Sequence, residues 1–380
     1  MAGPIKKLAS PVVHAASGLM IVVLAIGSLV YFVNGSSNAL GPHSEDLRLR
    51  WNENSKFVSH LNPNAGQQPG SDAAVYPPWS YVLGFPLAPP LDFRMVKYWY
   101  WIVECLCLIV ICSWAYKTIP TASIRLRWLA ALSCAAICGN LNAISLGQYS
   151  IIPTAFLAGA LLSLERGRNT TPGLLLGLSF LKPQIPILHV AGLVFRNARR
   201  FWRPFALAAG IVISASLIAW WWTRTDPFTM LAQAADTASR WRRSHVHSLY
   251  FASFALPMKP LLRSIILAAV ALRASITASL RMRKGSLVDQ FAVCSVFSML
   301  LLDHSPYDNI MLAFLVIALM GRALETKSPT PLILYLLSGI TLWLPVPPHV
   351  NLGGIEYLIW TLGAFYLIVV PSASSRYSHV

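Results

Sequence analysis

The stretch PVVHAASGLMIVVLAIGSLVYFV, residues 11–33, contains no Asp, Glu, Lys or Arg. An α-helix of about 20 mainly apolar residues is long enough to cross the ~30 Å hydrocarbon core of a bilayer. Similar runs recur along the chain, at about 97–116, 128–146, 149–164, 204–222, 261–280, 288–302, 308–321, 331–345 and 352–370, with two shorter pieces at about 172–181 and 184–195. The sequence therefore predicts an all-α fold, a polytopic membrane helical bundle of about twelve segments.

The composition excludes an ordinary soluble enzyme. The 380-residue chain is 56% hydrophobic and 12% charged, and its mean hydropathy is +0.57, whereas soluble domains carry about 25% charged residues. A net charge of +16 would suggest nucleic-acid binding in a soluble protein. In a membrane protein it is explained by Lys and Arg gathering in cytoplasmic loops, so we expect membrane lipids and no nucleic acid as partners.

The basic residues also give an orientation. With Lys6 and Lys7 on the cytoplasmic side, more than half of the 30 Lys and Arg fall in inner loops. Both termini are then predicted to be cytoplasmic in a plasma (inner) membrane. Residues 1–380 form one integral membrane domain in this scheme, with two long extracytoplasmic loops at 34–96 and 223–260. Loops this long are usually functional or disordered, and their aromatic side chains favour short helices at the bilayer surface.

Lys182 lies in a segment too short to cross the membrane twice. Between Arg168 and Arg196, both predicted to be cytoplasmic, the chain must go out and return in fewer than thirty residues, whereas two spans need about 40. We therefore expect short pieces or a re-entrant hairpin with Lys182-Pro183 at its tip. A lysine at membrane depth is a candidate functional group, and its ammonium suits a phosphate. The alternative is a long stem that carries the charge to the interface.

Two acidic positions are candidates on the outer side. Asp46 follows the first apolar segment. A base at this position would serve an enzyme that handles a lipid-linked substrate. The alternatives are that Asp46 is a solvated loop acid, as most are, or that Glu45 is the base. The stretch DHSPYDN, residues 303–309, begins a late span. Its His304, Tyr307 and Asp308 side chains can bind sugar hydroxyls, position a phosphate or orient a base. For Asp308 the alternative is a helix cap favoured by the helix dipole.

Two further motifs carry polar side chains. NLN at 140–142 and GQY at 147–149 indicate a tight outer turn, in which Gly147 permits close backbone approach and Gln148 can hydrogen-bond a sugar. The basic run RWRRSHVH, residues 240–247, lies in the second long loop. Its candidates for binding an anionic head group are Arg243, His245 and His247, although such a run often only meets lipid phosphates.

Taken together, these motifs resemble the GT-C membrane glycosyltransferases, and specifically glycosyltransferase family 87, over about residues 20–320. The matching pieces are Asp46 in the first outer loop, YPPW at 76–79, GQY at 147–149, Gly173 to Gly177 leading into LKP at 181–183, HSL at 247–249 and SPYD at 305–308. That family includes α-mannosyltransferases that use polyprenol-phosphate-mannose. The resemblance implies a GT-C bundle and a hexosyltransferase of the cell envelope.

The resemblance also implies roles for particular residues. Asp46 would be the general base of an inverting transfer on the extracytoplasmic face, from a polyprenyl-phosphate sugar (mannose or another hexose) to a lipid or glycan hydroxyl. The phosphate leaves as a stabilised anion, so no general acid is required. The expected substrate-binding residues are Tyr76, Gln148, Lys182, Arg243, His245, His247, His304, Tyr307 and Asp308. No cofactor is expected beyond the donor substrate, and no ligand spacing indicates a metal site.

Two other functions fit the same features. A polytopic transporter or lipid flippase would also use intramembrane charge, but it would keep its function without a base at Asp46. A polysaccharide polymerase or ligase would use lipid-pyrophosphate donors. Transfer of labelled sugar in detergent separates an enzyme from a transporter, and donor preference separates the two enzymes.

Overall fold

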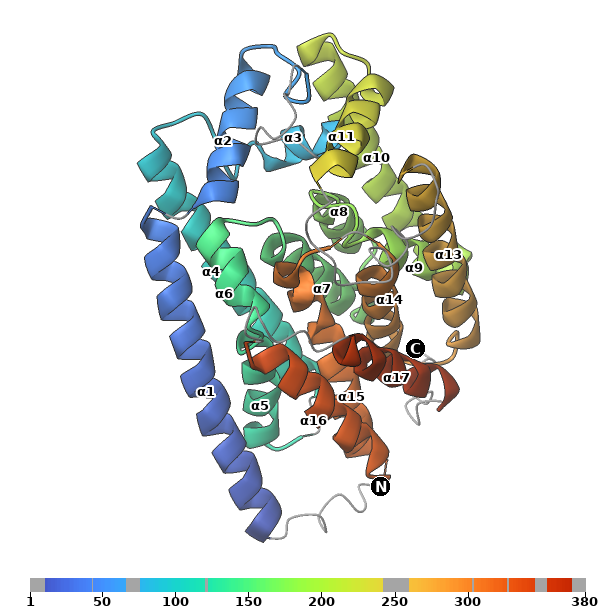
Figure 1. Cartoon of the computed structure of the whole chain (residues 1–380). Coiled ribbons are helices and arrows are strands. Elements are labelled where there is room, and N and C mark those ends of the chain that lie inside the picture. The colour runs from blue at the N-terminus through green and yellow to red at the C-terminus, as the bar shows by residue number, and fades with distance from the viewer. Residues whose placement is uncertain are drawn as a thin grey trace.

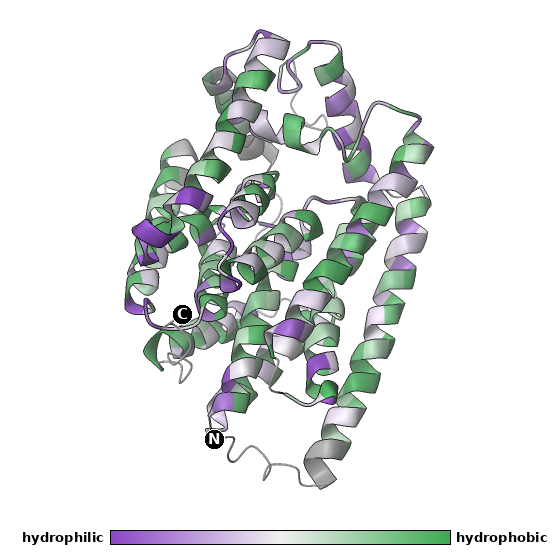
Figure 2. Cartoon of the chain, turned by 180° about the vertical axis from the view of Figure 1, so that it is seen from behind, coloured by the Kyte–Doolittle hydropathy of each residue, from purple (hydrophilic) through white to green (hydrophobic). Residues whose placement is uncertain are grey.

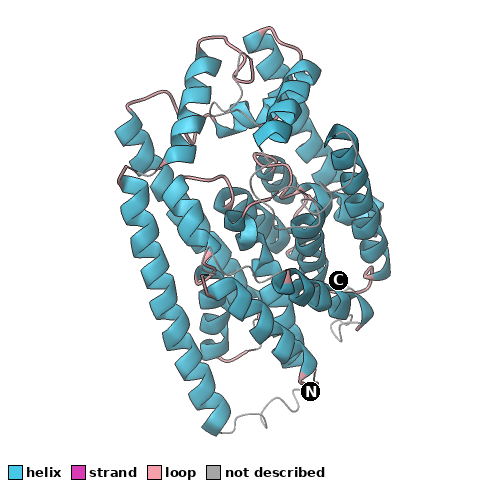
Figure 3. Cartoon of the chain, viewed as in Figure 1, coloured by secondary structure: helices cyan, strands magenta, loops and turns pink. Residues whose placement is uncertain are grey.

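The computed structural model describes residues 11–42, 44–65, 76–119, 122–241, 260–302, 304–326, 328–345 and 354–370. Within these ranges every regular element is a helix and no strand is present, as Figure 3 shows. This confirms the predicted all-α fold class.

The helix bounds follow the predicted apolar segments closely. The elements are α1 (Pro11–Leu40), α2 (Glu45–Val58), α3 (Pro78–Gly84), α4 (Phe93–Thr118), α5 (Ile124–Ala135), α6 (Gly139–Leu146), α7 (Ile151–Glu165), α8 (Thr170–Ser179), α9 (Ile187–Arg196), α10 (Ala198–Thr223), α11 (Pro227–Trp241), α13 (Pro260–Arg281), α14 (Leu287–Leu301), the 3₁₀ helix η4 (Pro306–Leu312), α15 (Ala313–Glu325), α16 (Thr330–Trp343) and α17 (Ile355–Val369). Figure 1 shows α1 and α4 running along one side of the bundle.

Several of these helices can cross a bilayer. Among the described residues, four spans are long and apolar enough by themselves: Ala15–Leu40, Phe93–Thr118, Ala198–Thr223 and Pro306–Glu325. Five shorter apolar helices have 10–17 residues, which at about 1.5 Å per residue do not reach across ~30 Å. Figure 2 shows hydrophobic residues along the long helices. The chain is a helical membrane protein, while the number of its crossings stays a prediction.

The apolar run at 128–146, predicted as one span, is broken into two helices. Helices α5 and α6 meet at a bend of 51°. The Asn140 amide donates to the carbonyls of Cys134 and Ala135, both at 3.1 Å, and so satisfies the carbonyl groups that the bend frees. Asn140 and Asn142 therefore lie in α6 instead of forming the predicted turn.

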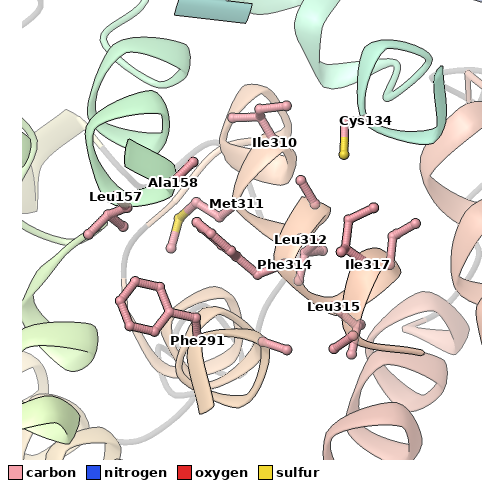
Figure 4. Close-up of a cluster of buried hydrophobic side chains, with 14 of the residues drawn as sticks. Cys134, Leu157, Ala158, Phe291, Ile310, Met311, Leu312, Phe314, Leu315 and Ile317 are labelled. Atoms are coloured by element: carbon pink, nitrogen blue, oxygen red, sulfur yellow. The ribbon is translucent and has the colours of Figure 1, made fainter. Parts of the chain in front are cut away.

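The core of the bundle surrounds η4 and α15. Side chains of Phe291, Ile310 and Phe314 are fully buried there, and Figure 4 shows them converging with residues of α5 and α7. Ridges of aromatic and branched side chains pack at close to crystalline density in such a core. Because η4 is enclosed on several sides, the polar residues at its start are fixed in position.

The two long loops pack on each other. Helices α2 and α3 of the first loop and α11 of the second gather at the top of Figure 1, and we call these three helices the cap. Asn62 Nδ2 donates to Gln233 Oε1 at 2.7 Å and Asn64 Nδ2 to the Met230 carbonyl at 3.2 Å. Helices were predicted in both loops, but this contact between the loops was not.

Candidate active site

Asp46 lies in the first turn of α2, only six positions after the end of α1. Acidic residues in a first turn are stabilised by the helix dipole, and Glu45 and Asp46 both occupy that turn. Their surroundings differ, because Glu45 is exposed and Asp46 is half-buried. Of the two acids named from the sequence, Asp46 is therefore the one that faces the interior.

Gly147 lets α2 come close to the bundle. It ends α6 with φ +71°, and a Cβ built on it would lie 2.5 Å from Leu47 Cβ. Only glycine adopts this conformation without strain and leaves room for Leu47. The close approach places Gln148 beside α2, where its Nε2 donates to Asp46 Oδ2. The side chain of Gln148 is 8% exposed, so this contact is largely shielded from water.

Opposing effects set the pKa of the Asp46 carboxyl. Burial raises its pKa above the ordinary value, while the Gln148 hydrogen bond and the charges of Arg50 and Lys182 pull the pKa down. A pKa raised toward the working pH makes a carboxylate a better proton acceptor. Asp46 and Lys182 are connected through the 148–150 segment, because Gln148 donates to Asp46 and Ser150 accepts from Lys182.

Lys182 occupies the turn between the ten-residue helices α8 and α9, as the predicted hairpin requires. It is 3% exposed. Its Nζ lies 2.5 Å from Asp308 Oδ1 and 3.1 Å from Ser150 Oγ, and 4.7 Å from the centre of the Tyr307 ring. The ammonium does not reach the interface on its long stem. It is neutralised inside the bundle.

Asp308 combines the two roles considered for it. Its Oδ2 accepts from the Ser305 backbone N–H at 3.1 Å, which caps η4. Its Oδ1 accepts from Lys182 and, at 2.6 Å, from Ser150 Oγ. These donors satisfy both oxygens of a carboxylate that is shielded from water. Because Asp308 is 1% exposed, the pair stays inside the protein.

The loop between α6 and α7 joins the two halves of the site. Gln148 contacts Asp46, and Ser150, two positions later, contacts both Lys182 and Asp308. Sequence analysis missed Ser150, which is fully buried. Its position directly after the GQY motif was the available signal. On the other side, Trp79 Nε1 donates to the Phe180 carbonyl at 2.9 Å and so ties α3 to the Lys182 turn.

A second polar cluster lies one and two turns along α2 and was also missed. Arg50 Nη1 lies 2.8 Å from Glu53 Oε2, and the Arg50 guanidinium sits 4.4 Å from the centre of the Tyr76 ring. Positions 46, 50 and 53 share one helix face by their spacing. That pattern could have been read from the sequence once 45–58 was recognised as a helix. Tyr76, predicted to bind substrate, thus borders the same face.

The remaining candidates lie elsewhere or outside the described residues. His304 Nδ1 lies 3.2 Å from the Leu302 carbonyl oxygen, and its ring centre lies 6.3 Å from that of Tyr357. Arg243, His245 and His247 lie outside the residues that the structure describes. Within those it does describe, no group of three or more His, Cys, Asp or Glu side chains is placed to hold a metal ion.

Fold and site define a class: a helical membrane protein with a cluster of charged side chains between a helical cap and its bundle. The family model of glycosyltransferase family 87 matches residues 74–303. The chain therefore belongs to glycosyltransferase family 87 and is a glycosyltransferase. The matched segment contains Tyr76, Gln148 and Lys182, whereas Asp46 precedes it and Asp308 follows it. Comparisons with curated proteins and with solved structures gave no match.

Proposed function

We propose that this glycosyltransferase moves a hexose, mannose first among them, from a polyprenyl-phosphate donor to a hydroxyl of a lipid or glycan acceptor. The reaction takes place where the cap meets the bundle, on the extracytoplasmic side of the plasma membrane in the topology predicted above. The observation that carries the proposal is the convergence of a half-buried carboxylate, Asp46, and a buried ammonium, Lys182, on the single loop that holds Gln148 and Ser150.

In this mechanism Asp46 is the general base. Its free carboxylate oxygen takes the proton from the acceptor hydroxyl as the acceptor oxygen attacks the anomeric carbon. The bond from that carbon to the donor phosphate oxygen breaks on the opposite face, and the polyprenyl phosphate leaves with the electron pair. The product is inverted, and the transition state resembles an oxocarbenium ion, as in inverting glycosidases.

Lys182 would stabilise the departing phosphate. The described residues supply oxygen acceptors for two of its three N–H groups, so one remains for a donor oxygen. Because Asp308 already balances the ammonium charge, we expect the pair to bind phosphate by hydrogen bonding at a fixed position rather than as an isolated cation. Tyr76 and Gln148 border the same space and would hold sugar or acceptor hydroxyls.

The test is a donor screen with full-length protein purified in detergent. Lipid-phosphate mannose, other lipid-phosphate sugars and a lipid-pyrophosphate sugar are offered with a membrane-lipid extract as the source of acceptors, and glycosylated products are identified by mass spectrometry. Asp46→Asn should lower transfer from the active donor by about 10²–10⁴-fold, the usual contribution of a general base. Glu45→Gln, which alters the exposed neighbour, should retain wild-type transfer.

Three outcomes would contradict the proposal. Full transfer by Asp46→Asn removes the assigned base. Transfer from the pyrophosphate donor alone indicates a polymerase or ligase. No transfer from any donor, combined with movement of intact lipid-linked sugar across liposome membranes, indicates a flippase.

A further inference from the structure

A second candidate binding site lies along α13, outside the candidate active site. A cavity of about 380 Å³ opens between α13, α14 and α17. Its polar lining comes from α13, with Arg273, Thr277 and Arg281 at helical spacing, and its apolar walls include Val270, Phe297 and Ile368. None of these residues belongs to the candidate active site, and the proposed function leaves them without a role.

The cavity runs along α13, from near Phe297, whose neighbour Ser298 donates to the Gln184 carbonyl beside the Lys182 turn, to Arg281 at the end of the helix. Helix α9 begins just after the Lys182 turn and ends at Arg196, whose Nη1 donates to the Ser286 carbonyl at 3.3 Å and to Gln290 Oε1 at 3.0 Å. Arg281 is the last residue of α13 and lies five positions before Ser286. The cavity therefore reaches the end of the bundle where α13 turns into α14.

The two arginines lie on a helix that is predicted from the sequence to cross the membrane. Arg273 is exposed, and the nearby apolar side chains of Val270 and Leu272 on the same helix are 49% and 38% exposed. It lies eight residues, about 12 Å, from Arg281 along the helix axis. No ion pair joins either arginine to a carboxylate of the described part of the chain. An arginine at membrane depth is unfavourable unless something compensates its charge.

We propose that this cavity binds one anionic phospholipid. The two guanidinium groups and the Thr277 hydroxyl donate to its phosphate oxygens, and Arg pairs with phosphate in a planar, bidentate geometry. Its acyl chains lie along Val270, Phe297 and Ile368. Basic pockets between membrane helices have this function in other proteins. The combination of an apolar cavity with two unpaired cations favours a lipid anion over a free one, because inorganic phosphate would leave the apolar walls unfilled.

The experiment measures lipid binding to the purified full-length protein by native mass spectrometry and by the shift of its melting temperature. Phosphatidylglycerol is compared with zwitterionic phosphatidylcholine, with inorganic phosphate and with a polyprenyl phosphate. The test variant is Arg273→Gln/Arg281→Gln. The matched control is Arg199→Gln/Arg203→Gln, which removes two exposed arginines from the start of α10 and leaves the cavity intact. Ala274→Leu provides a second test variant, because it fills the cavity without changing charge.

We expect one phosphatidylglycerol per chain, bound about 30-fold more weakly by the double-arginine test variant, since each arginine contributes about a factor of five. Ala274→Leu should also lose the lipid, and the control should keep it. Equal binding by wild type and both test variants would overturn the inference. So would an equal loss in the control, or preferential binding of phosphatidylcholine, inorganic phosphate or the polyprenyl phosphate.

Discussion

Gly147→Ala tests whether the close approach of α2 to the bundle sets the position of Asp46. The added Cβ would lie 2.5 Å from Leu47 Cβ, whereas ordinary contact begins at 3.4 Å. The first turn of α2 would have to move by the difference, about 0.9 Å, and Asp46 precedes Leu47 in that turn. A misplacement of about 1 Å in a reacting group lowers the rate by about 10²-fold.

The same substitution also strains the backbone, and a matched control separates the two effects. A side chain at positive φ costs about 1–2 kcal/mol. Gly167 has φ +70°, almost the value of Gly147, but a Cβ there meets nothing within 4 Å. Gly167→Ala therefore carries the strain without the displacement.

Both variants are assayed for initial rates of sugar transfer with the donor identified by the screen, and for thermal unfolding. We expect similar, modest losses of stability in both proteins. Transfer should fall about 10²-fold in Gly147→Ala and stay near wild type in Gly167→Ala. A wild-type rate in Gly147→Ala, or an equal loss in both variants, would refute the argument that this glycine positions the base.

Three other changes follow from the contacts around the site. Gln148→Met removes the hydrogen bond that holds down the pKa of Asp46, so the acidic limb of the pH–rate profile should move to higher pH; an unmoved limb contradicts the assignment. Burial raises the pKa of Glu53 to about 7. The folded protein therefore keeps this proton at pH values at which the unfolded chain has already lost it. Stability should then fall as pH rises from about 4.5 to 7, and chemical denaturation should show a weaker fall in Glu53→Gln. Lys182→Met and Arg322→Met each break a buried ion pair and should cost about 3–5 kcal/mol in thermal or chemical unfolding. Only Lys182→Met should weaken donor binding. Equal donor affinity in Lys182→Met and Arg322→Met would contradict the proposal that Lys182 binds the donor phosphate.

Much of the fold was predictable because apolar length is a strong signal in a membrane protein. The ends of α4, α7 and α13 fall within a few residues of the predicted spans. The break between α5 and α6 was not predictable from hydropathy, since the predicted apolar run continues across it. It depends on the Asn140 amide reaching two carbonyls of the preceding helix, which is a three-dimensional contact.

The candidate site shows a similar division. Asp46, Gln148, Lys182 and Asp308 were each named from the sequence, and the structure places them around one loop. The sequence did not reveal that Lys182 pairs with Asp308, because two charges 126 positions apart form no local pattern. Ser150 was missed for the same reason, since a serine at the start of a helix ordinarily looks like a cap.

The separation of 126 residues between Lys182 and Asp308 has a consequence for the synthesis of the protein. In the predicted topology, the Lys182 hairpin enters the bilayer while the segment carrying its counter-ion is still unsynthesised, and a lone ammonium in hydrocarbon is unfavourable by roughly 2.5–3.5 kcal/mol. Until η4 arrives, the hairpin can rest against α7 and α10 but remains electrostatically incomplete. A product truncated before η4 would therefore present an unneutralised lysine within the membrane, a feature by which biogenesis factors could distinguish unfinished chains from mature ones.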